Sequence, residues 1–122
     1  MLRPVFSFVL FFTLVSGAAA TPIDSYRARL SDKDHFNSTG TQLNSAAAII
    51  RQDRANFYIF GNMDPEDESD TFFNDKANRA RLEKMLLRGQ LSAEHMEVIV
   101  NGTPLIRIDI HADHIEVFVE EH

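Results

Sequence analysis

The fold is decided by residues 96–119, which read MEVIVNGTPLIRIDIHADHIEVFV. Two runs within this stretch alternate apolar and mostly polar side chains, as a strand with one buried face requires. The apolar members are Ile106, Ile108 and Ile110 in the first run and Ile115, Val117 and Val119 in the second. A further apolar run, Met96–Val100, precedes them. We therefore predict an antiparallel meander of three strands.

The loop between the last two runs sets how they pair. A four-residue loop over 111–114 places Ile110 opposite Ile115 and Ile108 opposite Val117, so that the apolar side chains share one face. The upstream chain has to cover that face, because the other face carries mainly charged residues.

Two segments upstream have the pattern of helices. The first is expected to begin at Asn44 or Ser45 and to end before Gly61, and the second to run from about Asp75 to Arg88 and to stop at Gly89. Apolar residues at helical spacing form one stripe of the first helix: Ala46, Ile49, Ile50, Phe57 and Phe60. The predicted fold class is α+β, with two helices packed on one face of a three-stranded antiparallel β-meander.

The first twenty residues have the pattern of a cleaved signal peptide. A positive start that contains Arg3 is followed by the apolar run Val5–Val15 and by the small residues Ala18–Ala20. The apolar run is shorter than the roughly 20 residues of a membrane-spanning helix, so a permanent anchor is the less favoured reading. We expect residues 1–20 to be a signal peptide, 21–43 a polar N-terminal arm and 44–122 a single α+β domain. The predicted location is the periplasm or the outside of the cell, with no stable membrane insertion after the signal peptide is removed.

Composition excludes several classes of function. The chain has 122 residues, a formal net charge of −6 and no cysteine. An acidic protein is a poor partner for nucleic acid, because the phosphate backbone attracts lysine and arginine. Without cysteine the chain has no disulfide, no thiol chemistry and no thiolate zinc site. No motif typical of a cofactor-binding protein occurs, and we expect no cofactor.

Two stretches carry side chains of the kind that bind metal ions. Residues 64–70 hold five carboxylates, which suit a hard cation such as calcium, but they lack the spacing and the glycine of a calcium loop. His111, Asp113 and His114 fall in the loop between the last two predicted strands and offer donors for zinc or copper. Both stretches also have a simpler interpretation, as exposed and solvated loops.

A polar group on the first predicted helix is the third candidate. Asp53 falls on the apolar stripe of the helix, so it should be partly buried and paired with an arginine, for which Arg79 or Arg81 is the expected partner. Alternatively, His35, Asp53 and Arg54 line a small ligand-binding cleft, in which the arginine holds a carboxylate.

Three functions remain open on these observations. We favour a small non-enzymatic binding or interaction module, because no catalytic motif occurs. Its partner is expected to be another protein or a second copy that pairs through the sheet. The outer sheet face would offer Ile99, Leu105 and Phe118 as an apolar interaction surface. The alternatives are a ligand-binding protein or hydrolase-like enzyme that uses His35, Asp53 and Arg54, and a metal-binding protein that uses His111 and His114 or the acidic loop 64–70.

Overall fold

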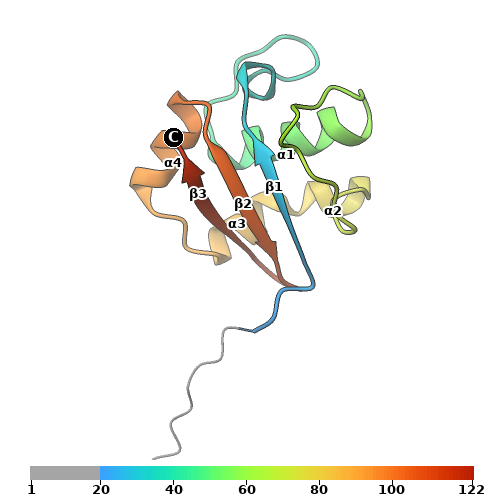
Figure 1. Cartoon of the computed structure of the whole chain (residues 1–122), viewed down its shortest axis with the longest axis vertical. Helices are drawn as coiled ribbons and strands as arrows, with labels where there is room; N and C mark the ends of the chain where they lie inside the picture. The colour runs from blue at the N-terminus through green and yellow to red at the C-terminus, as the bar shows by residue number, and fades with distance from the viewer. Residues whose placement is uncertain (1–19) are drawn as a thin grey trace, which may run out of the picture.

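The structure is a computed structural model that describes residues 20–122 (Figure 1). The predicted signal peptide therefore lies, apart from Ala20, outside the described residues. The helices and strands follow the order β1 Asp24–Arg29, the 3-10 turn η1 Asp32–His35, α1 Ala46–Tyr58, α2 Lys76–Ala80, α3 Leu82–Arg88, α4 Ala93–Asn101, β2 Leu105–Ile110 and β3 Ile115–Glu121. In this part of the chain no helix combines the length and the apolar character that a membrane crossing needs.

The α+β prediction is confirmed by a three-stranded antiparallel sheet in the order β1-β2-β3. The predicted pairing of the last two strands is also confirmed, with Ile110 opposite Ile115 and Ile108 opposite Val117. The 111–114 loop closes with a hydrogen bond from the His111 amide to the His114 carbonyl oxygen.

The predicted first strand of the meander is wrong, because Met96–Val100 belongs to helix α4. The Ser92 hydroxyl caps this helix by accepting a hydrogen bond from the His95 amide at 3.1 Å. The cap and the good helix formers after it override the strand preference of the β-branched residues. As a result Ile99, predicted on the outer face of the sheet, is fully buried on the inner side of α4.

The missing strand comes from the segment that was predicted as a polar arm. In β1 the buried Tyr26 and Ala28 alternate with the exposed Arg27 and half-buried Arg29, which is the same period of two as in β2 and β3. β1 pairs with the edge of β2, and Tyr26 lies opposite Ile108. It thus occupies the edge that the predicted strand over 96–100 would have taken.

The helical layer has four helices instead of the predicted two. The predicted helix over 75–88 is divided into α2 and α3 at Arg81, and α4 is added to the layer. Both predicted helix starts agree with the structure, since the Ser45 hydroxyl caps α1 by accepting from the Ala48 amide and the Asp75 carboxylate caps α2 by accepting from the Ala77 amide.

One core lies between the sheet and the helices, which cover the same face of the sheet (Figure 1). Its fully buried apolar side chains include Leu30 after β1, Ile49 and Ile50 of α1, Phe73 before α2, Leu82 and Met85 of α3, Ile99 of α4, and Ile106, Ile108, Ile110 and Ile115 of the sheet. The outer face of the sheet is polar and is cross-linked by ion pairs such as Arg27–Glu120, at 3.0 Å.

Helix α3 ends against the sheet at Gly89. A Cβ atom at this position would overlap with the carbonyl oxygen of Ile115, so only glycine allows so close an approach to β3. Gly89 itself has ordinary helical angles, and the left-handed conformation that terminates the helix falls on Gln90, with φ of 57°. The contact also shows that the Ile115 carbonyl points out of the sheet, away from β2.

Candidate functional site

Asp53 and Arg54 lie in a buried ionic cluster with Asp70. The guanidinium group of Arg54 is fully buried and donates to the Asp53 carboxylate at 2.9 Å and to the Asp70 carboxylate at 3.1 Å. It also donates to the Glu68 carbonyl oxygen and lies 3.8 Å above the centre of the Tyr26 ring. Asp53 is therefore buried and paired as predicted, but its partner is its sequence neighbour and not Arg79 or Arg81. Arg79 instead donates to the Phe73 carbonyl oxygen.

Burial dominates the electrostatics of this cluster. It raises the pKa of Asp53 well above the usual value, while the Arg54 guanidinium opposes that shift. Asp53 Oδ1, Arg54 Nη2 and Tyr26 Oη are buried without a hydrogen-bond partner among the described residues. Because Asp53 and Arg54 are 1% and 0% exposed, a ligand in solution cannot reach the charged groups in this conformation.

His35 lies apart from the cluster, in η1 beside α4. Its Nδ1 is 2.8 Å from the Ser31 carbonyl oxygen and its Nε2 is 2.9 Å from the Ile99 carbonyl oxygen, so the ring connects η1 to α4. The same side chain borders a surface groove of about 420 Å³ together with Phe36, Val100 and Gly102. Within residues 20–122 no hydrogen bond or ion pair joins His35 to Asp53 or Arg54.

Asp34 links η1 to α1. Its carboxylate is buried and accepts hydrogen bonds from Asn56 Nδ2 at 2.9 Å and from the Ser31 amide at 3.1 Å. Burial raises the pKa of this carboxyl to about 6, against the lowering effect of the Asn56 hydrogen bond. The folded protein therefore holds the Asp34 proton more tightly than the unfolded chain does.

This shift predicts how stability depends on pH. A raised carboxyl pKa contributes stability that is fully present below about pH 4 and is lost as the pH rises through 6. When the pH is lowered from 7 to 5, protonation of Asp34 should raise the free energy of unfolding by about 1 kcal/mol. Urea unfolding at the two pH values measures the gain. An Asp34→Asn variant should show a smaller gain, and an equal gain in both proteins would refute the assignment to Asp34.

The acidic loop 64–70 covers the outer edge of β1. The Glu68 amide donates to the Arg27 carbonyl oxygen at 2.9 Å, and the Arg27 amide donates to the Glu68 carboxylate at 2.7 Å. The Arg29 amide donates to the Asp67 carboxylate at 2.8 Å. The loop thus acts as the pairing partner of the edge strand, and Asp70 at its end is buried, contrary to the prediction of a solvated loop.

The other edge of the sheet, β3, is open along most of its length. Within residues 20–122 no hydrogen bond reaches the outer side of the backbone between Glu116 and Glu121. The backbone groups of successive residues in a strand point alternately toward the paired strand and away from it. The Ile115 carbonyl points away from β2, toward Gly89. The amide and carbonyl groups of Val117 and Val119 therefore point to the same outer side. These groups are available to pair with another strand.

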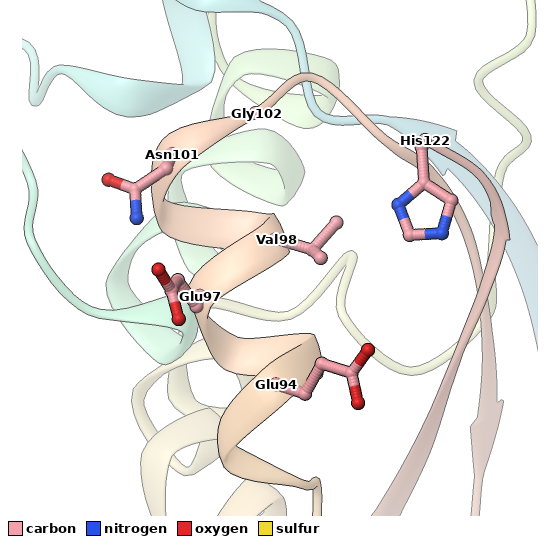
Figure 2. A pocket seen from close by; sticks show the side chains of 6 residues that line it. All are labelled: Glu94, Glu97, Val98, Asn101, Gly102 and His122. Atoms are coloured by element: carbon pink, nitrogen blue, oxygen red, sulfur yellow. The ribbon is translucent and has the colours of Figure 1, made fainter.

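A groove runs between this open edge and α4. Its upper part encloses about 440 Å³ and is bordered by Glu94, Glu97, Val98, Asn101 and Gly102 of the α4 segment and by His122 after β3. Figure 2 shows Glu94 and Val98 directed across the groove toward the end of the chain at His122. Its lower part, about 330 Å³, lies between residues 89–95 and residues 116–118. On the sheet side the lower part is bordered by Glu116, Val117 and Phe118 and the upper part by His122.

The predicted interaction surface is only partly on the outside. Ile99 is buried, Leu105 is half-buried and Phe118 is 38% exposed. The Arg107 guanidinium covers one face of the Phe118 ring at 4.4 Å from its centre. The apolar patch proposed from these three residues therefore reduces to Phe118 and part of Leu105.

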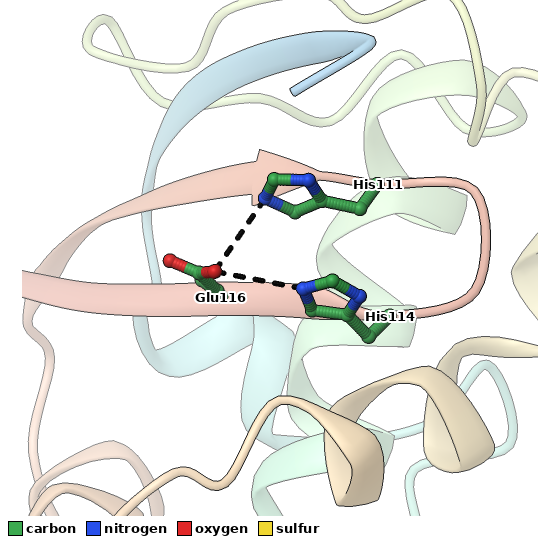
Figure 3. A group of neighbouring side chains, drawn as sticks. All are labelled: His111, His114 and Glu116. Carbon is green, nitrogen blue, oxygen red and sulfur yellow. Dashed lines mark ion pairs between the residues drawn. The ribbon is translucent and has the colours of Figure 1, made fainter. Parts of the chain in front are cut away.

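The histidines of the 111–114 loop lie next to each other (Figure 3). The two rings are stacked, with centres 4.3 Å apart and planes at 2°. The Nε2 atoms of His111 and His114 are 3.6 Å and 3.5 Å from the same oxygen of Glu116. Asp113, the third residue predicted here, contacts His114 Nδ1 at 2.8 Å, and Glu116 supplies the third donor of the group.

Comparison of the chain with models of known protein families, with curated proteins and with solved structures found no match.

Proposed function

We propose that this chain is an exported, non-enzymatic interaction module that binds an extended, positively charged segment of a partner protein as a fourth strand at β3. The observation that carries the proposal is the difference between the two sheet edges. The acidic loop covers β1, whereas the backbone of β3 is open beside a groove. An open edge with an adjoining groove is the arrangement used in β-strand addition, where main-chain hydrogen bonds supply affinity and side-chain pockets supply specificity.

The charge of the groove supports a cationic partner. Glu94 and Glu97 of α4 and Glu116 of β3 line the groove. Glu121 of β3 is paired with Arg29. Glu120 already pairs with Arg27, while among the described residues Glu94 and Glu97 take part in no ion pair. Lysine or arginine side chains on an incoming strand would find these carboxylates within reach.

The same charges disfavour a second copy of the chain as the occupant. A symmetric antiparallel pairing of two β3 strands about Phe118 would place Glu116 opposite Glu120 of the other copy. Directly opposed like charges destabilise a strand pair. The homodimer expected as one possibility from the sequence is therefore the weaker reading.

Two further observations support the rest of the proposal. The charged residues that suggested a hydrolase-like or ligand-binding site, Asp53 and Arg54, are buried in a structural cluster. The pattern of residues 1–20 supports export.

A defined peptide tests the proposal. An eight-residue peptide of alternating lysine and valine is expected to bind the purified protein, as measured by fluorescence anisotropy of a labelled copy. The same peptide with glutamate in place of lysine should not bind. A Glu94→Lys/Glu97→Lys variant should bind the cationic peptide about tenfold more weakly, since each exposed charge pair contributes on the order of 0.2–1 kcal/mol.

Glu83→Lys is the matched control, because Glu83 is an exposed glutamate on α3 outside the groove. This variant should bind like the unchanged protein. Equal binding of the cationic and anionic peptides, or an equal loss in the α3 and α4 variants, would contradict the proposal. A dimer in sedimentation whose formation is prevented by Val119→Pro would favour self-association instead.

A further inference from the structure

We propose that His111, His114 and Glu116 form a binding site for one divalent transition-metal ion, with zinc as its expected occupant. Both histidines come from the loop that joins β2 to β3, and Glu116 comes from the start of β3, so the hairpin alone assembles the three side chains (Figure 3). One donor atom from each residue lies within 4.8 Å of the other two.

Two of the three distances between donor atoms match those of a zinc coordination sphere. Ligands bound at about 2.0–2.2 Å in a tetrahedron lie roughly 3.3–3.6 Å apart. The two distances from Glu116 Oε1 to the histidine Nε2 atoms are 3.6 Å and 3.5 Å. The parallel rings have to tilt toward each other before both can direct a lone pair at one ion. This tilt is a rotation about the Cβ–Cγ bond, which costs little energy in histidine because the torsion has a broad minimum.

The hydrogen bonds around the rings prepare His114 as a ligand. A carboxylate can only accept, so the 2.8 Å contact to Asp113 requires the proton of a neutral ring to be on Nδ1. The free lone pair of Nε2 then faces the Glu116 carboxylate. Two electron-rich groups at 3.5 Å repel each other unless a proton or a metal ion lies between them. A carboxylate that orients the second nitrogen of a histidine is a usual companion of metal-bound histidine.

The turn that carries these residues is fixed from outside the hairpin. Arg81 donates to the Ala112 carbonyl oxygen and Arg88 donates to the Asp113 carbonyl oxygen, both at 3.3 Å. The His111 amide donates to the His114 carbonyl oxygen. A ligand set held by a closed turn needs little rearrangement to bind an ion.

The donors select the class of cation. Two imidazole nitrogens and one carboxylate oxygen suit zinc or copper, whereas calcium and magnesium prefer oxygen ligands in larger number. Three protein ligands leave a fourth position for water. His111 is buried, while the side chains of His114 and Glu116 are 26% and 39% exposed, so an ion can enter from solvent.

Protons compete with the metal at this site. Zinc binds a deprotonated histidine nitrogen, so a proton and the ion cannot occupy the same Nε2 atom.

Isothermal titration of the purified protein with zinc chloride at pH 7.5 tests the inference. We expect saturable binding with a stoichiometry of one, no comparable binding of calcium, and shifts of the Nε2 resonances of His111 and His114 in histidine NMR spectra. His114→Ala and Glu116→Gln should each weaken zinc binding at least tenfold. Both positions are partly exposed, so the variants are expected to fold, which circular dichroism verifies.

His122→Ala is the matched control, because this histidine is exposed at the end of the chain and lies outside the cluster. It should bind zinc within twofold of the unchanged protein. Absence of saturable zinc binding, or equal binding by the unchanged protein and the His114 and Glu116 variants, would overturn the inference. Glu116 also borders the groove, but Glu94 and Glu97, which the peptide experiment changes, lie outside the zinc site, so zinc binding can hold even if peptide binding at β3 fails.

Discussion

An Arg54→Met variant is expected to lose about 3–5 kcal/mol of folding stability. Methionine fills the space of the arginine with an unbranched apolar side chain. The carboxylates of Asp53 and Asp70 then remain in the protein interior without their common cation. Removal of one partner from a buried charge pair is costly because the remaining charge cannot regain water. A loss of this size is a large part of the 5–15 kcal/mol that stabilises a typical domain.

Urea unfolding followed by circular dichroism measures this loss. Arg51→Met is the control, since Arg51 is an exposed arginine on the same helix and should change stability by less than about 0.5 kcal/mol. If Arg54→Met and Arg51→Met were equally stable, Arg54 would not be the cation that compensates the buried carboxylates.

A Gly89→Ala variant is expected to lose about 3 kcal/mol, at the upper end of the range for overpacking. The new methyl group would overlap with the Ile115 carbonyl oxygen, and a backbone atom in a paired strand cannot move aside as a flexible side chain can. Either α3 or β3 has to shift, and both carry core residues such as Leu86 and Ile115.

The midpoint of thermal unfolding reports this effect. Gln90→Ala is the matched control, because it changes the adjacent exposed residue without adding atoms near β3. A Gly89→Ala protein as stable as this control would show that α3 does not approach the Ile115 carbonyl closely.

The sequence predicted the hairpin of β2 and β3 correctly because two independent signals agreed there. The alternation of apolar residues marked both strands, and the four-residue loop set their register. For α4 the signals conflicted. Val98, Ile99 and Val100 favour a strand, while Ser92 and the residues after it favour a capped helix, and tertiary packing against α1 decided for the helix.

β1 was missed although its pattern was present. Tyr26, Ala28 and Leu30 alternate with polar residues, but the arginines and the alanine lower the apolar content below that of a typical strand. Its strand character depends on the edge of β2 on one side and on the acidic loop on the other. Such a dependence on distant segments is not visible in a local pattern.

The candidate sites were predictable to different degrees. The histidines of the 111–114 loop were found from sequence because the residues are close in the chain, whereas Glu116 as the third donor was identified from the structure. The pairing of Asp53 was foreseen from its place on the apolar stripe, but the choice of Arg54 as its partner was not, because it depends on the position of Asp70 16 residues away. The covering of β1 by the acidic loop likewise requires the fold.

Amide hydrogen exchange at β3 tests the central proposal most directly. In the free protein the amides of Val117 and Val119 face outward and should exchange rapidly, whereas inner amides of β2 exchange slowly. Saturation with the alternating lysine–valine peptide is expected to slow the exchange of Val117 and Val119 at least tenfold, because the added strand accepts their hydrogen bonds. Unchanged exchange at these two amides in the saturated complex would contradict strand addition at β3.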